Sequence, residues 1–316
     1  MAGDSENSRL DDAARAGWLY FIAGNTQGEI AKKLNVSRPT AQRLVSLALS
    51  ARLITFRLEH PIAACMALAK ELKERFALMF CDVVPTDSSA PAAISGIAKS
   101  AAAFLEHRLR SEAPAIVALG TGRTLRAAVE EIPAMNCPNH QLVSLVGNIS
   151  PDGSASFYDV LTRMSDLTRA PHYPMPLPLF ASSAEERDLF AGLSTVRKVR
   201  ALAQRADVTL VGVGQIDLDA QILLDGFVSR ADLLDFKRNG SIGEIVGWCF
   251  DAEGNIVAGP SRDRITSVPL ETPAKRLVVG AASGAAKVAA IRAALIGKLL
   301  SGLITDEHTA EAVLRA

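Results

Sequence analysis

Residues 115–126 read A-I-V-A-L-G-T-G-R-T-L-R, a short apolar run that ends at a glycine and continues in a helical pattern. The same arrangement recurs at residues 208–212 and at residues 277–280. Short apolar runs that alternate with helical segments are typical of parallel strands joined by helices that cover both faces of the sheet. Residues 59–316 are therefore predicted to form a Rossmann-like, parallel α/β domain.

One stretch of this region departs from the pattern. Residues 171–178 read P-H-Y-P-M-P-L-P. Proline has no backbone N–H to donate and fixes its own φ, so this density of prolines favours an extended connection over a helix or a central strand.

The composition limits the class of protein. At roughly 150 residues per domain, 316 residues indicate two domains. Hydrophobic residues make up 49% of the chain and charged residues 22%, which excludes wholesale disorder. Four scattered cysteines without a C-x-x-C pair argue against a structural zinc site and a disulfide scaffold, so neither a metal nor a cofactor is predicted.

No membrane segment or signal peptide is expected. The most apolar late stretch, residues 277–300, is interrupted by Lys287, Arg292 and Lys298. The first twelve residues carry four acids where a signal peptide would carry positive charge. We therefore expect a cytoplasmic protein that does not bind membranes.

The start of the chain is predicted to form a winged helix-turn-helix domain over residues 1–58. After ten polar residues expected to be disordered, a first helix carries one apolar stripe, formed by Leu10, Ala14, Trp18 and Ile22. A second helix is expected over residues 27–34, and a third begins near Arg38 with Ser37 as its N-cap. Alternating apolar residues at positions 54–58 indicate a strand, the wing.

The third helix has the side chains that read DNA. Arg38 and Arg43 suit guanine or phosphate, Gln42 suits adenine, and the hydroxyls of Ser37 and Thr40 suit either kind of contact. Gln27, at the start of the second helix, completes the set of expected DNA-binding residues. Between positions 27 and 58 six basic residues and one acid give a net charge of +5 in a neutral chain. The alternative is a small helical cap with a solvated basic face.

Motifs along almost the whole chain carry a family resemblance. They are W-L-Y-F-I-A-G-N-T-Q-G-E-I-A-K-K-L-N-V-S-R-P-T-A-Q-R-L at residues 18–44, G-T-G-R-T-L at 120–125, L-V-G-V-G at 210–214, G-S-I-G-E-I at 240–245, F-D-A-E-G at 250–254, A-A-K-V-A-A-I-R-A-A-L at 285–295 and L-I-T-D-E-H-T-A at 303–310. Together they resemble the SorC family of sugar-responsive bacterial transcriptional regulators. Thr121 is a departure, since many members carry a bulky aromatic residue there, and it bears on which effector fits.

The resemblance implies a sugar-isomerase-like effector domain, similar in fold to the glucosamine-phosphate deaminase and ribose-phosphate isomerase group. It also implies two partners, double-stranded operator DNA and a small sugar, polyol or sugar-phosphate effector. It further implies a homo-oligomer, a dimer or commonly a tetramer, built largely through the effector domains. A helix-turn-helix independently favours a symmetric dimer, because one short helix contacts too few bases.

The expected effector site lies at the carboxyl ends of the strands, where glycines let backbone N–H groups approach a ligand and helix N-termini favour anions. Arg123 and Lys287 would serve a phosphorylated ligand, and the hydroxyls and Asn148 a neutral polyol. Each loop alone could be a plain tight turn, and residues 251–255 (D-A-E-G-N) are predicted as a hairpin turn. The candidate residues are Gly120, Thr121, Gly122, Arg123, Thr124, Gly147, Asn148, Gly212, Gly214, Gln215, Gly280, Ala281 and Lys287.

Two other functions remain to be weighed. A sugar-phosphate isomerase or deaminase with an accessory helical domain could use Asp217, Asp219, Glu244 or Asp251 as acid or base. No arrangement of paired carboxylates and histidine demands such chemistry, and the basic first domain would be unexplained, so the chain is predicted not to be an enzyme. A scaffold that assembles through the α/β domain would bind no DNA.

Overall fold

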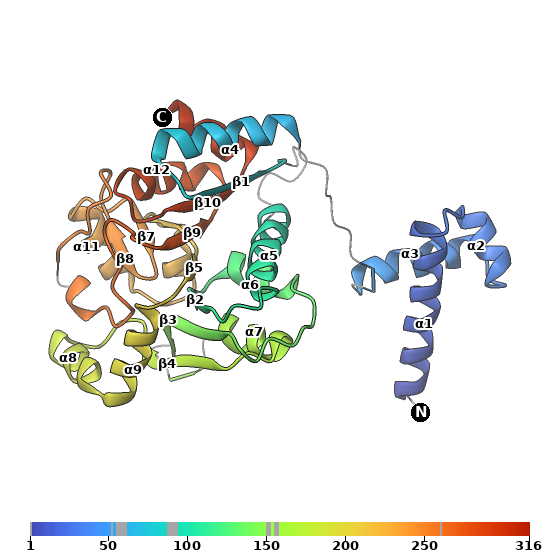
Figure 1. Cartoon of the computed structure of the whole chain (residues 1–316), viewed down its shortest axis with the longest axis horizontal. Coiled ribbons are helices and arrows are strands. Elements are labelled where there is room, and N and C mark those ends of the chain that lie inside the picture. The colour runs from blue at the N-terminus through green and yellow to red at the C-terminus, as the bar shows by residue number, and fades with distance from the viewer. Residues whose placement is uncertain are drawn as a thin grey trace. The chain divides into compact units, whose positions relative to one another are not determined.

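The computed structural model describes residues 2–51, 53–54, 62–86, 94–149, 153–154, 158–259 and 261–316, with side chains from Ser8 onward. The chain divides into two compact units, Met1–Pro61 and Ile62–Ala316 (Figure 1). The boundary expected between residues 58 and 59 lies outside the described residues. The expected wing also lies outside them from residue 55 onward.

The first unit contains the three predicted helices, α1 (Ala2–Phe21), α2 (Gln27–Lys33) and α3 (Arg38–Ser50). Thr26 caps α2 and forms a capping box with Glu29. Ser37 caps α3, accepting a hydrogen bond from the Thr40 N–H at 3.3 Å. Both caps satisfy backbone N–H groups that a helix start leaves unpaired, which fixes the turn between α2 and α3.

Two expectations for α1 were wrong. The helix begins at Ala2, so residues 2–10 are helical rather than disordered, and its buried face is formed by Ala13, Ala16 and Gly17 rather than by the predicted stripe. A Cβ added to Gly17 would lie 2.5 Å from Ile54 Cδ1 and 2.8 Å from Ala48 Cβ. Only small residues permit this close approach, and Trp18, next to Gly17, is exposed.

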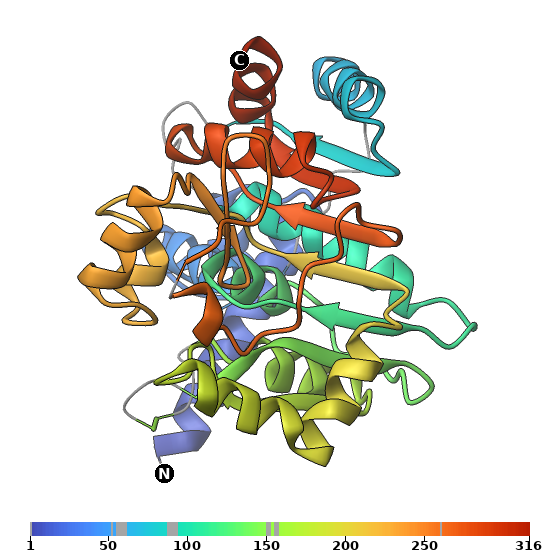
Figure 2. The same ribbon diagram turned by 90° about the vertical axis from the view of Figure 1, so that its left-hand side faces the viewer.

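The second unit is built on a seven-stranded parallel sheet in the order β1-β10-β9-β5-β2-β3-β4. In Figure 2 the strands follow one another from β1 near the top toward β3 lower down. A small antiparallel sheet joins β6, β7 and β8. The strands are β1 (Phe80–Val84), β2 (Ile116–Leu119), β3 (Gln141–Ile149), β4 (His172–Pro178), β5 (Val208–Val211), β6 (Gly214–Gln215), β7 (Gly243–Ile245), β8 (Trp248–Phe250), β9 (Leu277–Ala281) and β10 (Gly302–Asp306).

Helices cover both faces of the large sheet. One buried cluster lies between the sheet and α5, α6 and α7, and the other lies between the sheet and α4, α9, α12 and α13. This is the parallel α/β architecture predicted from the sequence. The helices are α4 (Ala63–Phe76), α5 (Ser95–Leu109), α6 (Arg123–Glu130), α7 (Val160–Thr168), α8 (Ala184–Gly192), α9 (Ser194–Ala203), α10 (Gln221–Leu224), α11 (Arg230–Arg238), α12 (Val288–Ile296) and α13 (Glu307–Arg315), with 3-10 turns η1 (Arg262–Arg264) and η2 (Ala285–Lys287).

The proline-dense stretch forms strand β4 rather than a mere connection, but it lies at the edge of the sheet. Met175 and Leu177 point into the core, while Pro174 and Pro176, which alternate with them, are exposed. An edge strand pairs on one side only, and its pairing with β3 is irregular in register, so the missing N–H groups are tolerated.

The order of the strands reverses between β2 and β5. The chain runs from β2 outward to β3 and β4, then returns and runs from β5 outward to β9 and β10. From the adjacent carboxyl ends of β2 and β5, the chain therefore continues toward opposite ends of the sheet. Such a switch point is where open α/β sheets hold their ligands.

The tight contact at Gly17 yields a test of the first unit. We expect Gly17→Leu to destabilise it by about 1–3 kcal/mol, because the new side chain overpacks the interface with Ala48 and Ile54. Calorimetry of the full chain should show one transition lowered and the other unchanged. Gly28→Ala is the control: its Cβ would meet nothing closer than 4.0 Å, and alanine suits a helix better than glycine by roughly 0.5–1 kcal/mol. Equal behaviour of the two variants would contradict this packing.

Candidate functional site

The loops after β2 and β5 lie against each other at the switch point. The Gly120 N–H donates a hydrogen bond to the Leu210 carbonyl at 2.9 Å. A Cβ added to Gly212 would lie 3.9 Å from the Thr121 carbonyl oxygen. Gly120 and Thr121 are thus brought together with Gly212, at the ends of two strands that are neighbours in the sheet.

The start of α6 is open toward this site. Gly122 has φ +116° and is the N-cap residue, without a side-chain cap, and an added Cβ there would meet nothing within 4 Å. Arg123 is exposed and Thr124 is half-buried in the first turn. Free N–H groups at a helix start, with a guanidinium beside them, suit an anion.

Glu244 was not among the predicted effector residues. It lies on β7 opposite Gly214 of β6, and a Cβ on Gly214 would come within 2.3 Å of Glu244 Oε1. Its Oε2 accepts a hydrogen bond from the Gly247 N–H at 2.9 Å. Burial raises the pKa of Glu244, while the Gly247 N–H and the charge of Lys287 oppose the rise.

Lys287 closes the other side of the site. It ends η2, in the connection that follows β9, and its N–H donates to the Gly284 carbonyl at 2.9 Å. Burial lowers the pKa of Lys287; Glu244 raises it and Arg123 lowers it. Two cations and one carboxylate therefore interact at the edge where β2, β5 and β9 end. Such a set can bind a phosphate and accept hydrogen bonds from hydroxyls.

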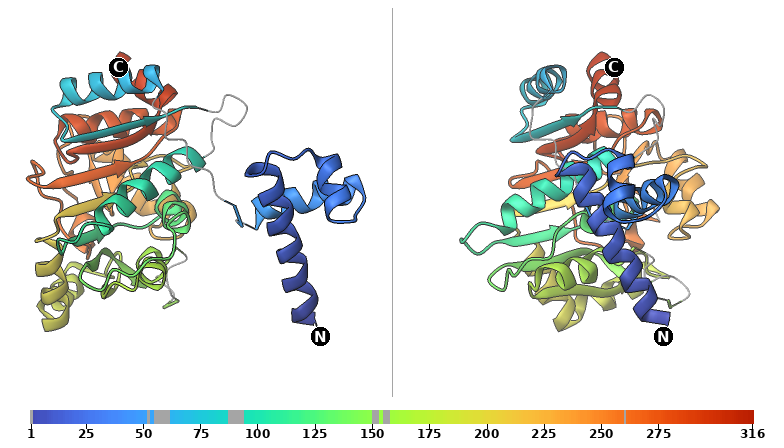
Figure 3. Two further views of the ribbon diagram at one scale, coloured as in Figure 1. Left: turned by 45° about the vertical axis from the view of Figure 1, so that its right-hand side comes forward. Right: turned by 90° about the vertical axis from the view of Figure 1, so that its right-hand side faces the viewer.

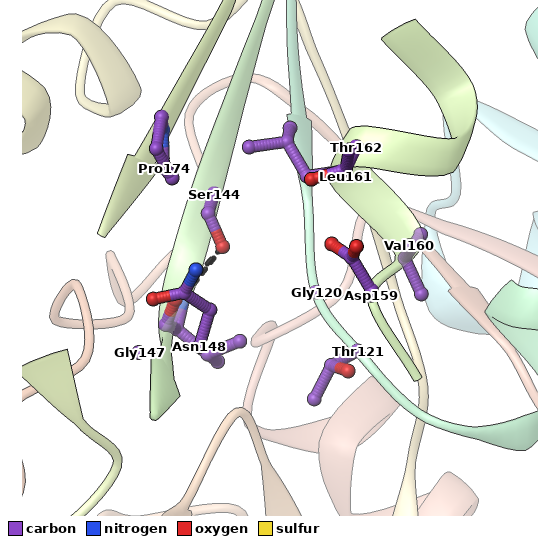
Figure 4. A pocket seen from close by; sticks show the side chains of 11 residues that line it. Gly120, Thr121, Ser144, Gly147, Asn148, Asp159, Val160, Leu161, Thr162 and Pro174 are labelled. Carbon is purple, nitrogen blue, oxygen red and sulfur yellow. Dashed lines mark hydrogen bonds between the residues drawn. The ribbon is translucent and has the colours of Figure 1, made fainter. Parts of the chain in front are cut away.

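A small cleft extends the site toward β3 (Figure 4). Gly120, Thr121 and Asn148 line it together with Ser144 and the start of α7, residues 159–162. Within the described part of the chain, the buried Oδ1 of Asn148 has no hydrogen-bond partner, so it can accept a bond from a ligand hydroxyl. The cleft residues of α7 were not predicted, because nothing local in the sequence sets them apart.

Other predicted site residues have different placements. Gly280 and Ala281 are buried inside β9 rather than in the loop beyond it, and a Cβ on Gly280 would lie 2.6 Å from Leu300 Cδ1. Gly147 also lines the cleft, but it lies within β3, where a Cβ would come within 2.0 Å of the Leu177 carbonyl oxygen. These glycines serve strand packing. Residues 251–255 form the predicted turn, closed by hydrogen bonds between Asp251 and Asn255.

A polar network next to Arg123 also went unpredicted. The Tyr158 hydroxyl donates to Asp225 Oδ1 at 3.0 Å, and Gln221 of α10 donates to the same carboxylate. Burial and Asp225 raise the pKa of Tyr158 to about 12, against the effect of Arg123. This network joins α10 to the segment before α7.

The predicted DNA-binding residues lie at the starts of α2 and α3. Arg38, Gln42 and Arg43 are exposed in the first two turns of α3, and Gln27 begins α2. The Ser37 and Thr40 hydroxyls lie 2.8 Å apart and hydrogen-bond to each other, so capping already uses part of their capacity.

Comparisons with known proteins agree with this architecture. Residues 60–315 match the family described as "Putative sugar-binding domain". The chain is 32% identical to the erythritol catabolism regulatory protein EryD of Brucella abortus (strain 2308), over 96% of each chain. It is also 32% identical to the transcriptional regulator LsrR of Klebsiella pneumoniae, over 95% of this chain and 92% of that one. The crystal structure of the full-length sorbitol operon regulator SorC from Klebsiella pneumoniae superposes with a TM-score of 0.71 at 22% identity, covering 96% and 99%.

The chain belongs to the SorC/DeoR-type family of sugar-binding transcriptional regulators. The resemblance seen in the sequence motifs is thereby confirmed.

Family membership decides between the functions weighed above. The relatives are transcriptional regulators, so this SorC/DeoR-type chain is a transcriptional regulator and not an isomerase or deaminase. Among the described residues no helix could span a membrane. No group of three or more His, Cys, Asp or Glu side chains in the described ranges could hold a metal ion.

The charges at the switch point predict that two substitutions shift the pKa of Lys287 in opposite directions. Because Glu244 raises the pKa of Lys287 and Arg123 lowers it, Glu244→Gln should lower that pKa further and Arg123→Ala should raise it. Acetylation of Lys287 as a function of pH, followed by mass spectrometry, measures this: only the neutral amine reacts. The reactive range should move to lower pH in the first variant and to higher pH in the second. Exposed Lys298 is the internal reference, and shifts of the same sign would contradict the proposed arrangement.

Proposed function

We propose that this regulator binds operator DNA through α3 and that a small phosphorylated sugar or polyol at the switch point sets its DNA affinity. The proposal rests on the open start of α6 beside Arg123 and on the charge interactions that couple Lys287 to Arg123 and to Glu244. A phosphate would bind both cations and the free N–H groups of α6.

The rest of the ligand is expected to be rich in hydroxyls. Glu244 and the Oδ1 of Asn148 accept hydrogen bonds, and the Thr121 hydroxyl can donate or accept one. EryD and SorC are named for erythritol and sorbitol, two polyols, which supports this class. With threonine at position 121, the cleft floor is polar rather than aromatic. A neutral polyol would bind to these groups and would leave Arg123 and Lys287 without an anionic ligand group.

The DNA-binding surface is proposed to be the start of α3. Arg38, Gln42 and Arg43 are exposed there, while the buried face of α3 packs against α1 and α2. A symmetric reader needs two such helices, so we propose that the chain acts as a homo-oligomer, a dimer or a tetramer.

Arg43→Ala tests the DNA-binding role. If Arg43 pairs with a base, the variant should lose about 1–3 kcal/mol of binding free energy. The DNA is a duplex that the protein has selected from a random pool. Fluorescence anisotropy measures the affinity. Arg197→Ala, an exposed arginine of α9, is the control and should leave it unchanged. Equal losses on selected and random duplexes would make Arg43 a phosphate contact, and no loss on either would remove it from the interface.

The paired cations give the test of the effector site. In the double variant Arg123→Ala, Lys287→Ala, phosphorylated sugars or polyols that change DNA binding by the wild-type chain should no longer do so, while ligand-free DNA binding stays intact. Arg230→Ala with Lys237→Ala on α11 removes two exposed cations elsewhere and is the control. An unaltered response in the first variant would overturn the site assignment. If the wild-type chain responded only to unphosphorylated polyols, the proposed effector would be a neutral polyol instead of a phosphorylated one.

A further inference from the structure

The cleft that extends the site toward β3 has a carboxylate on one wall. Asp159, the residue before α7, lines it together with Thr121, Ser144 and Asn148. In Figure 4 the Asp159 side chain lies across the cleft from Ser144 and Asn148, which belong to β3. Thr121 and Asp159 lie at the starts of α6 and α7, two helices that pack against each other on one face of the sheet (Figure 3).

Asp159 occupies the position of a helix cap but does not cap α7. Its side chain forms no capping hydrogen bond. Asp306, at the same position before α13, accepts a 2.8 Å hydrogen bond from the Thr309 N–H. The backbone explains the difference, because Asp306 is extended, with φ −101°, whereas Asp159 has φ +23°, in the left-handed region. The carboxylate of Asp159 is therefore available to a ligand.

The negative charge of Asp159 is not neutralised by a neighbouring side chain. Among the described residues it forms no ion pair. Arg163, one turn along α7, is exposed, and only its backbone N–H bonds to Asp159, at the carbonyl. Arg126 of α6 is paired with Glu130 at 2.7 Å and donates to the Tyr158 carbonyl at 3.1 Å. The start of α7 attracts negative charge, and Asp159 already supplies it.

The hydrogen-bonding groups of the cleft suit a donor. An ionised aspartate can only accept hydrogen bonds. The buried Oδ1 of Asn148 also accepts, and within the described part of the chain it has no partner. The Ser144 hydroxyl already donates to the Val146 carbonyl at 2.8 Å. A hydroxyl group complements these acceptors, whereas a phosphate or a carboxylate brings only further acceptors.

The size of the cleft sets the same limit. Its volume of about 20 Å³ is room for roughly one water molecule or one hydroxyl group. A phosphate group, with its several oxygens, needs more space. Thr121 on the cleft is followed directly by Gly122 and Arg123 at the open start of α6. A ligand whose phosphate lies at α6 can therefore reach the cleft with its other end.

We propose that the cleft binds an uncharged, hydroxyl-bearing end of the effector and that Asp159 excludes a second anion from it. This deepens the proposed function and rests on it. The effector is then a monophosphate whose far end is an alcohol, and not a bisphosphate or a phosphorylated sugar acid. Asp159 accepts a hydrogen bond from the terminal hydroxyl and repels a carboxylate or phosphate in the same place.

Two pairs of ligands test this, because the members of each pair differ only at the end away from the phosphate. Sorbitol 6-phosphate ends in a hydroxymethyl group and 6-phosphogluconate in a carboxylate; erythritol 4-phosphate and 4-phosphoerythronate differ in the same way on a shorter chain. In isothermal titration calorimetry of the full chain, the alcohol of at least one pair should bind about tenfold more tightly than the acid. Asp159→Asn should bring the two affinities close together, mainly through tighter binding of the acid. Asparagine keeps an acceptor oxygen and tolerates a positive φ.

Asp166→Asn is the matched control. Asp166 is exposed on the same helix and does not line the cleft, so this variant should keep the wild-type ratio of affinities. A ratio that Asp159→Asn leaves unchanged, or a wild-type chain that binds the acids as tightly as the alcohols, would overturn the role of Asp159 alone. If neither phosphorylated alcohol bound more tightly than sorbitol or erythritol themselves, the proposed phosphate site would be wrong, and this inference with it.

Discussion

The reversal of strand order between β2 and β5 is the constraint on which the rest of the second unit depends. The connections that follow these two neighbouring strands run in opposite directions, so no single helix covers the carboxyl ends of both strands. The opening between them exposes the start of α6 and the loop at Gly212. Gly122, where an added Cβ would meet nothing within 4 Å, keeps the start of α6 free of a side chain, so that a ligand can reach the backbone.

The charges around the opening belong together physically. Taking Glu244 and Lys287 out of water disfavours both charged forms, which is why the pKa of the acid rises and that of the base falls. The attraction between Glu244 and Lys287 offsets part of that cost. The positive charge of Arg123 adds to the cost for Lys287. An anionic ligand between Arg123 and Lys287 would stabilise both cations.

Local signals made much of the fold predictable. Ser37 caps α3, and Ala41, Leu44, Val45 and Ala48 are its buried face, because a cap and a helical period are set by neighbours in sequence. The face of α1 was not predictable in this way, since both sides carry apolar residues and the choice depends on how closely Gly17 approaches Ala48. Gly280 was predicted to lie in a loop, but a glycine after an apolar run fits the interior of a strand equally well. Its place in β9 depends on packing against Leu300, which is distant in the sequence. Glu244 joins the site only through the pairing of β6 with β7, which no spacing in the sequence indicates.

Hydrogen exchange of the full chain, with and without phosphorylated sugars and polyols at millimolar concentration, tests the central claim most directly. The amides of residues 120–124, 243–247 and 284–287 should exchange more slowly with a ligand that also changes DNA affinity. The hollow at the opposite edge of the sheet, lined by residues 109–112 and 135–140, should be unaffected. Protection confined to that hollow, or slower exchange at neither edge with a ligand that changes DNA binding, would contradict the placement of the effector at the switch point.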